Sequence, residues 1–176
     1  GWTAADSGRL EVSASATRLT PFDSLARATL ELTPDSAAFR PLDGEASGRF
    51  TVAGSIERPA IAGRFTAADL VLDAWSVAAL EAEVRTDSLS TRGLQLDATA
   101  DTVRVGETMA RELAVTVGGR DDSLSIRARG ILPDARIGLA GWRVAGDSVA
   151  RLGLDSLALA LPHQHWTLAA PVRARS

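Results

Sequence analysis

The fold of this chain is decided by the stretch Gly54-Ser55-Ile56-Glu57-Arg58-Pro59-Ala60-Ile61-Ala62-Gly63-Arg64-Phe65. Pro59 has a fixed φ and no backbone N–H, so it fits best at the first residue of a strand. Gly54 and Gly63 have no Cβ, which lets two backbones approach closely. Apolar side chains stand at every second position on both sides of the turn. The stretch therefore predicts a β-hairpin whose strands share one apolar face.

The same alternation continues outward from this hairpin in both directions. Leu10, Val12 and Ala14 precede it, and residues 28–32 alternate as well. We interpret the later alternation as four successive short strands, marked by Leu94 and Leu96, by Val103 and Val105, by Leu113, Val115 and Val117, and by Leu124, Ile126 and Ala128. Paired glycines supply the positive φ of a tight turn, so Gly118-Gly119 is interpreted as a hairpin turn.

Three other segments need a separate interpretation. Residues 39–48 are predicted to be irregular, and Ile137 and Leu139 are expected to lead to Trp142 and Val144. Between residues 67 and 84 the apolar spacing also fits a helix, because Ala and Glu are good helix formers. We favour two strands there, with a break near residues 73–75 and with Leu80 and Val84 facing inward. The predicted fold class is all-β: one elongated antiparallel sheet of short amphipathic strands.

Composition limits the possible functions. The chain has 22 acidic and 19 basic residues without long runs of one sign, which argues against a surface for nucleic acid or anionic membranes. Every basic residue is Arg, and Lys, Asn and Tyr are absent, which indicates a GC-rich genome. With no Cys, the chain has neither a disulfide framework nor thiolate metal ligands. No stretch approaches 18 apolar residues, so we expect a soluble fragment of a much longer chain, with any membrane anchor outside it.

An Asp-Ser pair recurs at the junctions between alternating runs. Short polar side chains of this kind accept hydrogen bonds from nearby backbone N–H groups and close turns locally. The recurrence predicts that residues 1–176 form a single β segment built from internal repeats. The seven pairs begin at Asp6, Asp23, Asp35, Asp87, Asp122, Asp147 and Asp155.

Two motifs resemble the TamB family, the AsmA-like subunit of the bacterial translocation and assembly module. They are the G-x-I-x-x-P-x-I-x-G unit at residues 54–63 and a W-x-L-x-x-P strand opening at residues 166–171. The resemblance implies a long antiparallel sheet curled into an open, taco-like groove with an apolar interior. It also implies an inner-membrane anchor, a periplasmic location in a Gram-negative-type bacterium and an outer-membrane barrel partner of the TamA type. The implied function is carriage of phospholipid between the two membranes and support of outer-membrane protein assembly.

The residues by themselves favour a similar shape. Without a predicted helix layer, an amphipathic sheet must fold on itself as a sandwich, a barrel or a groove. A lining of Ala, Leu and Val that repeats layer by layer suits sliding acyl chains, because each buried CH₂ contributes about 0.8 kcal/mol in every layer. Ala114 and Thr116 are expected on the outer face. The predicted groove lining is Leu80, Val84, Leu94, Leu96, Val103, Val105, Leu113, Val115, Val117, Leu124 and Ile126.

Catalytic and cofactor sites have little support in the sequence. His163 and His165 would share one face of a strand, but a metal site would need a carboxylate such as Asp155 to complete it. The chain contains no G-x-S-x-G nucleophile elbow and no G-x-G-x-x-G or Walker pattern. We therefore expect no enzyme, no metal site and no cofactor.

Two alternatives to a lipid groove stay open. The first is a carbohydrate-binding β-sandwich, in which Trp residues stack on sugars. The second is a structural β-repeat of a cell-surface protein, whose apolar faces close on each other. We expect Trp75, Trp142 and Trp166 each to open a strand, which favours packing at a sheet edge over a binding platform.

Overall fold

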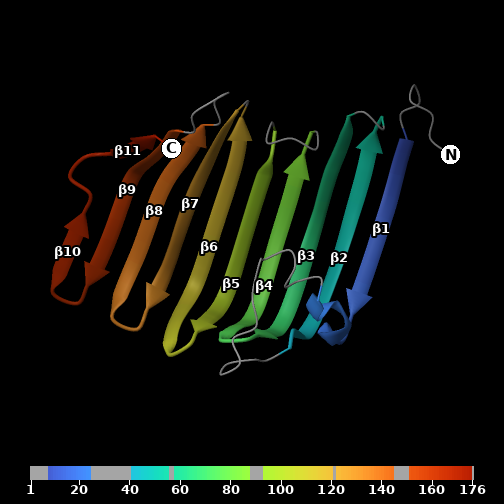
Figure 1. Cartoon of the computed structure of the whole chain (residues 1–176), viewed down its shortest axis with the longest axis horizontal. Helices are drawn as coiled ribbons and strands as arrows, with labels where there is room; N and C mark the ends of the chain where they lie inside the picture. The colour runs from blue at the N-terminus through green and yellow to red at the C-terminus, as the bar shows by residue number, and fades with distance from the viewer. Residues whose placement is uncertain are drawn as a thin grey trace.

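One open antiparallel sheet forms the structure (Figure 1). The computed structural model describes residues 8–24, 41–55, 58–87, 93–120, 122–144 and 151–175. They form an 11-stranded sheet, with one turn of 3-10 helix, η1 (Thr20–Phe22), after the first strand. The strands are β1 (Gly8–Ala16), β2 (Asp43–Gly54), β3 (Pro59–Leu72), β4 (Trp75–Thr86), β5 (Gln95–Val105), β6 (Thr108–Arg120), β7 (Ser123–Leu132), β8 (Ala135–Val144), β9 (Arg151–Leu161), β10 (Gln164–Thr167) and β11 (Val172–Arg175).

The strands follow the order of the chain. Strands β1 to β10 are neighbours in sequence order, and β11 pairs with the part of β9 that β10 leaves free. Consecutive strands from β1 to β10 are therefore neighbours in the sheet, which suits a segment that extends along one axis. The prediction of an all-β, elongated antiparallel sheet is confirmed. The predicted alternation at 28–32 lies outside the described residues.

The hairpin predicted from residues 54–65 is present. β2 ends at Gly54, whose φ is 97°, and β3 begins at Pro59. The backbone N–H of Arg58 donates to the carbonyl and to the hydroxyl of Ser55, both at 3.2 Å. The two strands then pair without a shift from Gly54 opposite Pro59 to Glu45 opposite Ala68.

Residues 67–84 form two strands and not a helix. β3 continues to Leu72, and β4 starts at Trp75 after a two-residue connection in which Asp73 has a φ of 51°. The predicted break at residues 73–75 is confirmed. Strand pairing on both sides outweighs the helix propensity of Ala and Glu in this segment.

Several predicted boundaries are wrong. Gly118 and Gly119 lie inside β6, which continues to Arg120, and β7 begins at Ser123. Residues 43–48 belong to β2 and are not irregular. Leu96 and Val103 belong to one strand, β5, and not to two. Trp166 lies within β10, and the chain leaves the sheet before Val172 starts β11, so the W-x-L-x-x-P motif does not open one continuous strand.

An extra residue in each of four adjacent strands explains why the sequence of β5 suggests two strands. Glu45 pairs with Ala68, but Asp43 pairs with Val71, so β3 holds one more residue than β2 around Asp69, whose φ is 50°. The register does not shift between β3 and β4, β4 and β5, or β5 and β6, so these strands share the extra residue. The shift ends between β6 and β7, beside Glu112, whose φ is 51°.

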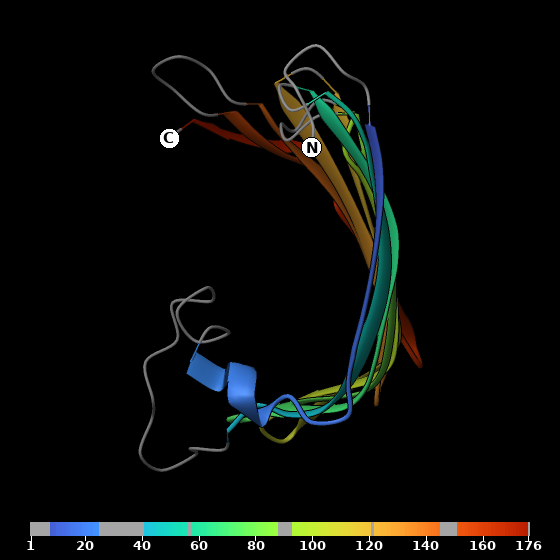
Figure 2. The ribbon, with the colours of Figure 1, turned by 90° about the vertical axis from the view of Figure 1, so that its right-hand side faces the viewer.

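The extra residues of β3 to β6 lie side by side and form a line of β-bulges across the sheet. This line of bulges keeps apolar side chains on one face and bends the sheet. Leu96 and Val103 are an odd number of residues apart, yet one extra residue returns both to the same face. Bulged strands also bend and twist more strongly than regular ones. Figure 2 shows β3 to β6 turning toward the concave side of the sheet near their shared hairpin end.

The left-handed backbone at Glu112 leads to a stability prediction. An L-residue with a side chain loses about 1 kcal/mol at such a φ, whereas glycine has no Cβ to clash. We expect Glu112→Gly to raise the free energy of unfolding by up to about 1 kcal/mol. Urea unfolding monitored by circular dichroism measures the change.

The matched control is Glu81→Gly, because Glu81 is also an outward carboxylate but lies at a regular position of β4. There the added backbone freedom should destabilise the chain by roughly 0.5–1 kcal/mol. A loss of stability in both variants would show that the bulge at Glu112 does not strain the backbone.

Candidate functional site: the apolar concave face

Cross-strand pairing collects apolar side chains into continuous rows. Partners in a sheet share a face, so a row can be followed from strand to strand through the register. The row that contains Val115 is apolar over nine strands. It consists of Ala14, Gly48, Phe65, Ala82, Ala98, Val115, Ala128, Leu139 and Leu157. We call the face formed by this row and its parallel rows the apolar face.

The adjacent positions form a polar row on the opposite side. It consists of Ser13, Arg49, Arg64, Glu83, Asp97, Thr116, Arg127, Ala140 and Ser156. We call this side the outer face. The sheet is therefore amphipathic across its width, as the period of two predicts.

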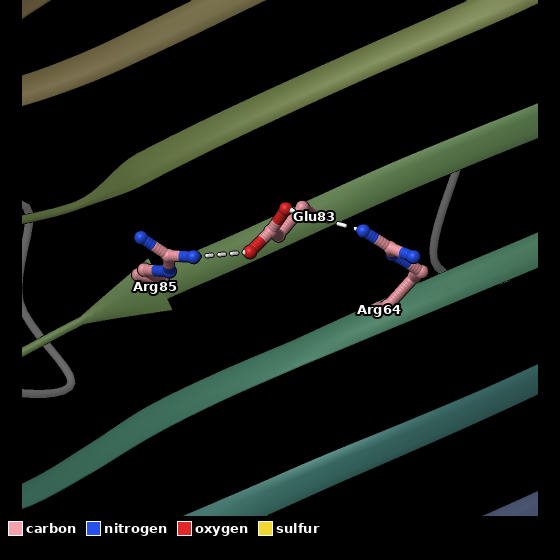
Figure 3. Close-up of polar contacts among 3 residues, drawn as sticks. All are labelled: Arg64, Glu83 and Arg85. Atoms are coloured by element: carbon pink, nitrogen blue, oxygen red, sulfur yellow. Dashed lines mark hydrogen bonds and ion pairs between the residues drawn. The ribbon is translucent and has the colours of Figure 1, made fainter.

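The apolar face lies on the concave side of the curled sheet. Figure 2 shows the curl, and the concave side, on which η1 lies, is the side that faces the reader in Figure 1. In Figure 1, β4 runs upward with β5 on its left and β3 on its right. In Figure 3, which shows Arg64, Glu83 and Arg85 of the outer face, β3 lies on the left of β4 when β4 is followed toward its arrowhead. The two figures therefore view the sheet from opposite sides. The polar residues are therefore seen from the convex side, and the apolar rows line the concave one.

The predicted lining residues all have positions in the apolar rows. The bulge line brings Val103 and Val105 to the same face as Leu96. Leu94 precedes β5, and its carbonyl accepts a hydrogen bond from the N–H of Gly119 at 2.6 Å, which continues a row next to the strand. Ala114 and Thr116 lie outside, as expected. The contact of the lining residues with an acyl chain stays a prediction.

This face has no second layer among the described residues. The buried residues there are Pro59, Ala67, Leu72, Ala100 and Gly130, and no large side chain within the described ranges is fully buried. Leu10 is 53% exposed, Val12 43% and Val105 39%. Monomeric proteins rarely leave a contiguous apolar patch of more than a few hundred Å² open to water, and larger patches usually mark a binding surface. The apolar face is therefore a candidate binding surface.

Large side chains on the sheet lie across glycines of the next strand. A Cβ added to Gly63 would clash with the Phe50 ring, and one added to Gly130 would come within 2.7 Å of Leu113. The glycines thus make room for neighbouring side chains to lie flat. The result is a thin and smooth apolar layer.

The charged side chains of the outer face are exposed to water. Glu83 pairs with Arg85 at 2.5 Å and with Arg64 at 3.7 Å, with side chains 40–69% exposed (Figure 3). The Thr116 hydroxyl donates to Asp97 at 2.9 Å. Exposed pairs of this kind contribute roughly 0–1 kcal/mol each, so they keep the face hydrated more than they stabilise the fold.

Open hollows also occur on the outer face. One of about 720 Å³ lies over β1 to β4, between side chains that include Arg49, Arg64 and Glu83. Another of about 790 Å³ lies over β4 to β8, beside Glu81, Glu112 and Arg129. Their walls mix both signs of charge, and none of the described residues forms a group of three or more ligands able to hold a metal ion. His163 lies in the connection before β10, and His165 is in β10 opposite Ala160.

The three Trp residues within the described ranges do not form one platform. Trp75 opens β4 as expected, and it lies with Trp166 in the apolar rows, where they are 51% and 61% exposed. The expectation that Trp142 opens a strand is wrong, because it lies within β8, on the outer face opposite Ser125. Its ring contacts Gly153, its Nε1 donates to Asp155 at 3.1 Å, and the Arg173 guanidinium stands 5.9 Å from the ring centroid.

Arg143 occupies the apolar face at the end of β8, whereas its neighbours Trp142 and Val144 lie on the outer face. The register of β7 and β8 is regular throughout, so Leu139, Gly141 and Arg143 share a face. Arg143 pairs with Leu124 on one side and with Leu152 on the other. Counting every second residue from Leu139 places Arg143 on the apolar face. The hydrophobicity of Trp142 and Val144 suggests instead that those two residues face the apolar side, which they do not.

The function of this face has to be interpreted from its own geometry. No protein-family model, no curated protein and no solved structure matches the chain. Within the described ranges, no helix is both long enough and apolar enough to cross a membrane.

Proposed function

We propose that the concave apolar face binds the acyl chains of phospholipids and lets them move along the sheet. The observation that supports this most is the row through Val115, which is apolar over nine strands and is partly exposed to water. Ten strands at about 4.8 Å spacing extend roughly 45 Å, far longer than one small-molecule pocket needs.

The chemistry of the lining suits an acyl chain better than a folded partner. Protein interfaces depend on a few aromatic and Arg anchors in shaped pockets. The rows here consist mainly of Ala, Val, Leu and Gly and repeat from strand to strand. A methylene chain that moves by one strand exchanges equivalent contacts of about 0.8 kcal/mol per CH₂ and meets no deep minimum.

The wider setting follows from the TamB resemblance and is part of the same proposal. The chain would be a segment of a periplasmic, inner-membrane-anchored protein that works with an outer-membrane barrel of the TamA type. It would carry phospholipid between the membranes and support outer-membrane protein assembly, without catalytic residues or a cofactor. The carbohydrate alternative stays a prediction, for which Trp75 and Trp166 lie in the apolar rows of two distant strands while Trp142 lies on the outer face.

Lipid extraction tests the proposal directly. We expect chain purified from a Gram-negative host to retain phospholipid, detected by mass spectrometry after solvent extraction. A photoreactive acyl chain should crosslink to Val115 and Ile126, and not to their outer-face neighbours Thr116 and Arg127, when each crosslinked residue is assigned by fragmentation in the mass spectrometer. Lipid-free protein that takes up no phospholipid and gives no crosslink would refute the acyl-chain function.

A further inference from the structure

Arg143 is the exception in the apolar face. In the strands that the structure describes, the register places one charged residue in the apolar rows, and it is Arg143. Its row consists of Leu10, Val52, Ile61 and Thr86, and then of Leu94, Gly119, Leu124, Arg143, Leu152 and Ala174. Other strand arginines, such as Arg127 and Arg129, lie on the outer face.

The guanidinium of Arg143 has no protein partner within the described part of the chain. No ion pair or hydrogen bond joins it to those residues, whereas Arg9, Arg64 and Arg85 each face a carboxylate. The residue is exposed and stands next to the last residue of β8. Its methylene stem can therefore lie along Leu124 and Leu152 while the charged head reaches water at the edge of the sheet.

We infer that Arg143 binds the oxyanion headgroup of an amphiphile whose acyl chain lies on the apolar face. This inference rests on the proposed function and adds the polarity of the ligand and its orientation. Guanidinium groups recognise phosphate and carboxylate through two parallel hydrogen bonds. The headgroup would lie at the rim formed by the end of β8, and the chain would extend inward past Gly141 and Leu139.

The experiment compares pairs of ligands that share their acyl chains, of which one member carries an anionic headgroup and the other a neutral one. One pair is phosphatidylglycerol and diacylglycerol with identical acyl chains, and the other is palmitate and methyl palmitate. Affinities of the purified chain are measured for wild type, Arg143→Gln, Arg143→Lys and the outer-face control Arg129→Gln. Thermal unfolding of each variant shows that the fold is retained.

We expect wild type to prefer the anionic member of a pair by roughly tenfold. Arg143→Gln should abolish that preference while leaving the affinity for the neutral member unchanged, and Arg143→Lys should keep part of it. Arg129→Gln should behave as wild type. The pair that loses its preference identifies the headgroup as phosphate or carboxylate.

Different results would refute different claims. A preference that survives in Arg143→Gln, that falls equally in Arg129→Gln, or that is absent in wild type overturns the role of Arg143 and leaves acyl-chain binding intact. If wild type binds neither the anionic nor the neutral amphiphile, the proposed function itself is wrong, and the inference fails with it.

Discussion

Val115→Asp is expected to abolish crosslinking of an acyl chain to the apolar face while the chain still folds. Val115 lies in the middle of the nine-strand apolar row and is only half-buried, so an introduced carboxylate can keep its oxygens in water. We expect a loss of about 1–2 kcal/mol in unfolding free energy from the missing apolar contacts. An acyl chain that passes the site would have to desolvate an ion, which should reduce crosslinking at least about tenfold.

The control for this variant needs an outer position that tolerates a carboxylate. Thr116→Asp is unsuitable, because Thr116 donates to Asp97 and the new carboxylate would face the old one. Ala114→Asp is better matched, since Ala114 is on the outer face opposite Arg129. It should change neither stability nor crosslinking. If Val115→Asp unfolds the chain outright and wild type never crosslinks, the apolar face is a core and not a conduit.

Gly63→Val is expected to destabilise the sheet more than Val115→Asp does. A Cβ at Gly63 would lie 2.8 Å from the carbonyl oxygen of Arg49 and closer still to the Phe50 ring. The Arg49 oxygen belongs to the backbone and cannot turn away as a side chain does. Separating β2 from β3 and displacing Phe50 should cost about 3 kcal/mol, or roughly 10 °C in Tm. Thermal unfolding monitored by circular dichroism measures this loss.

Gly138→Val is the matched control, because a Cβ at Gly138 meets no atom within 4 Å. Valine suits a strand better than glycine, so this variant should be neutral or stabilised by up to about 1 kcal/mol. Equal losses in the two variants would mean that the tight approach of Phe50 to Gly63 does not exist in solution. An undiminished Tm in Gly63→Val would have the same meaning.

The sequence by itself determined the class of structure and the two faces within each run. A period of two is a local property, because successive side chains of a strand point to opposite sides whatever the strand pairs with. Pro59 and Gly54 likewise determine their hairpin locally, through a fixed φ and a missing Cβ. These features were readable without knowledge of the neighbours of any strand.

Only the tertiary structure decided how those runs combine. Leu96 and Val103 have opposite phases, and they share a face because β3 to β6 all carry an extra residue relative to β2 and β7. Arg143 lies on the apolar face because β8 keeps its register with β7, although Trp142 and Val144 are the more hydrophobic choices. Register depends on hydrogen bonds between residues distant in sequence, and a slip of one residue moves every side chain to the other face. The curl that places the apolar rows on the concave side depends on the same cross-strand pairing, and no single run of residues specifies it.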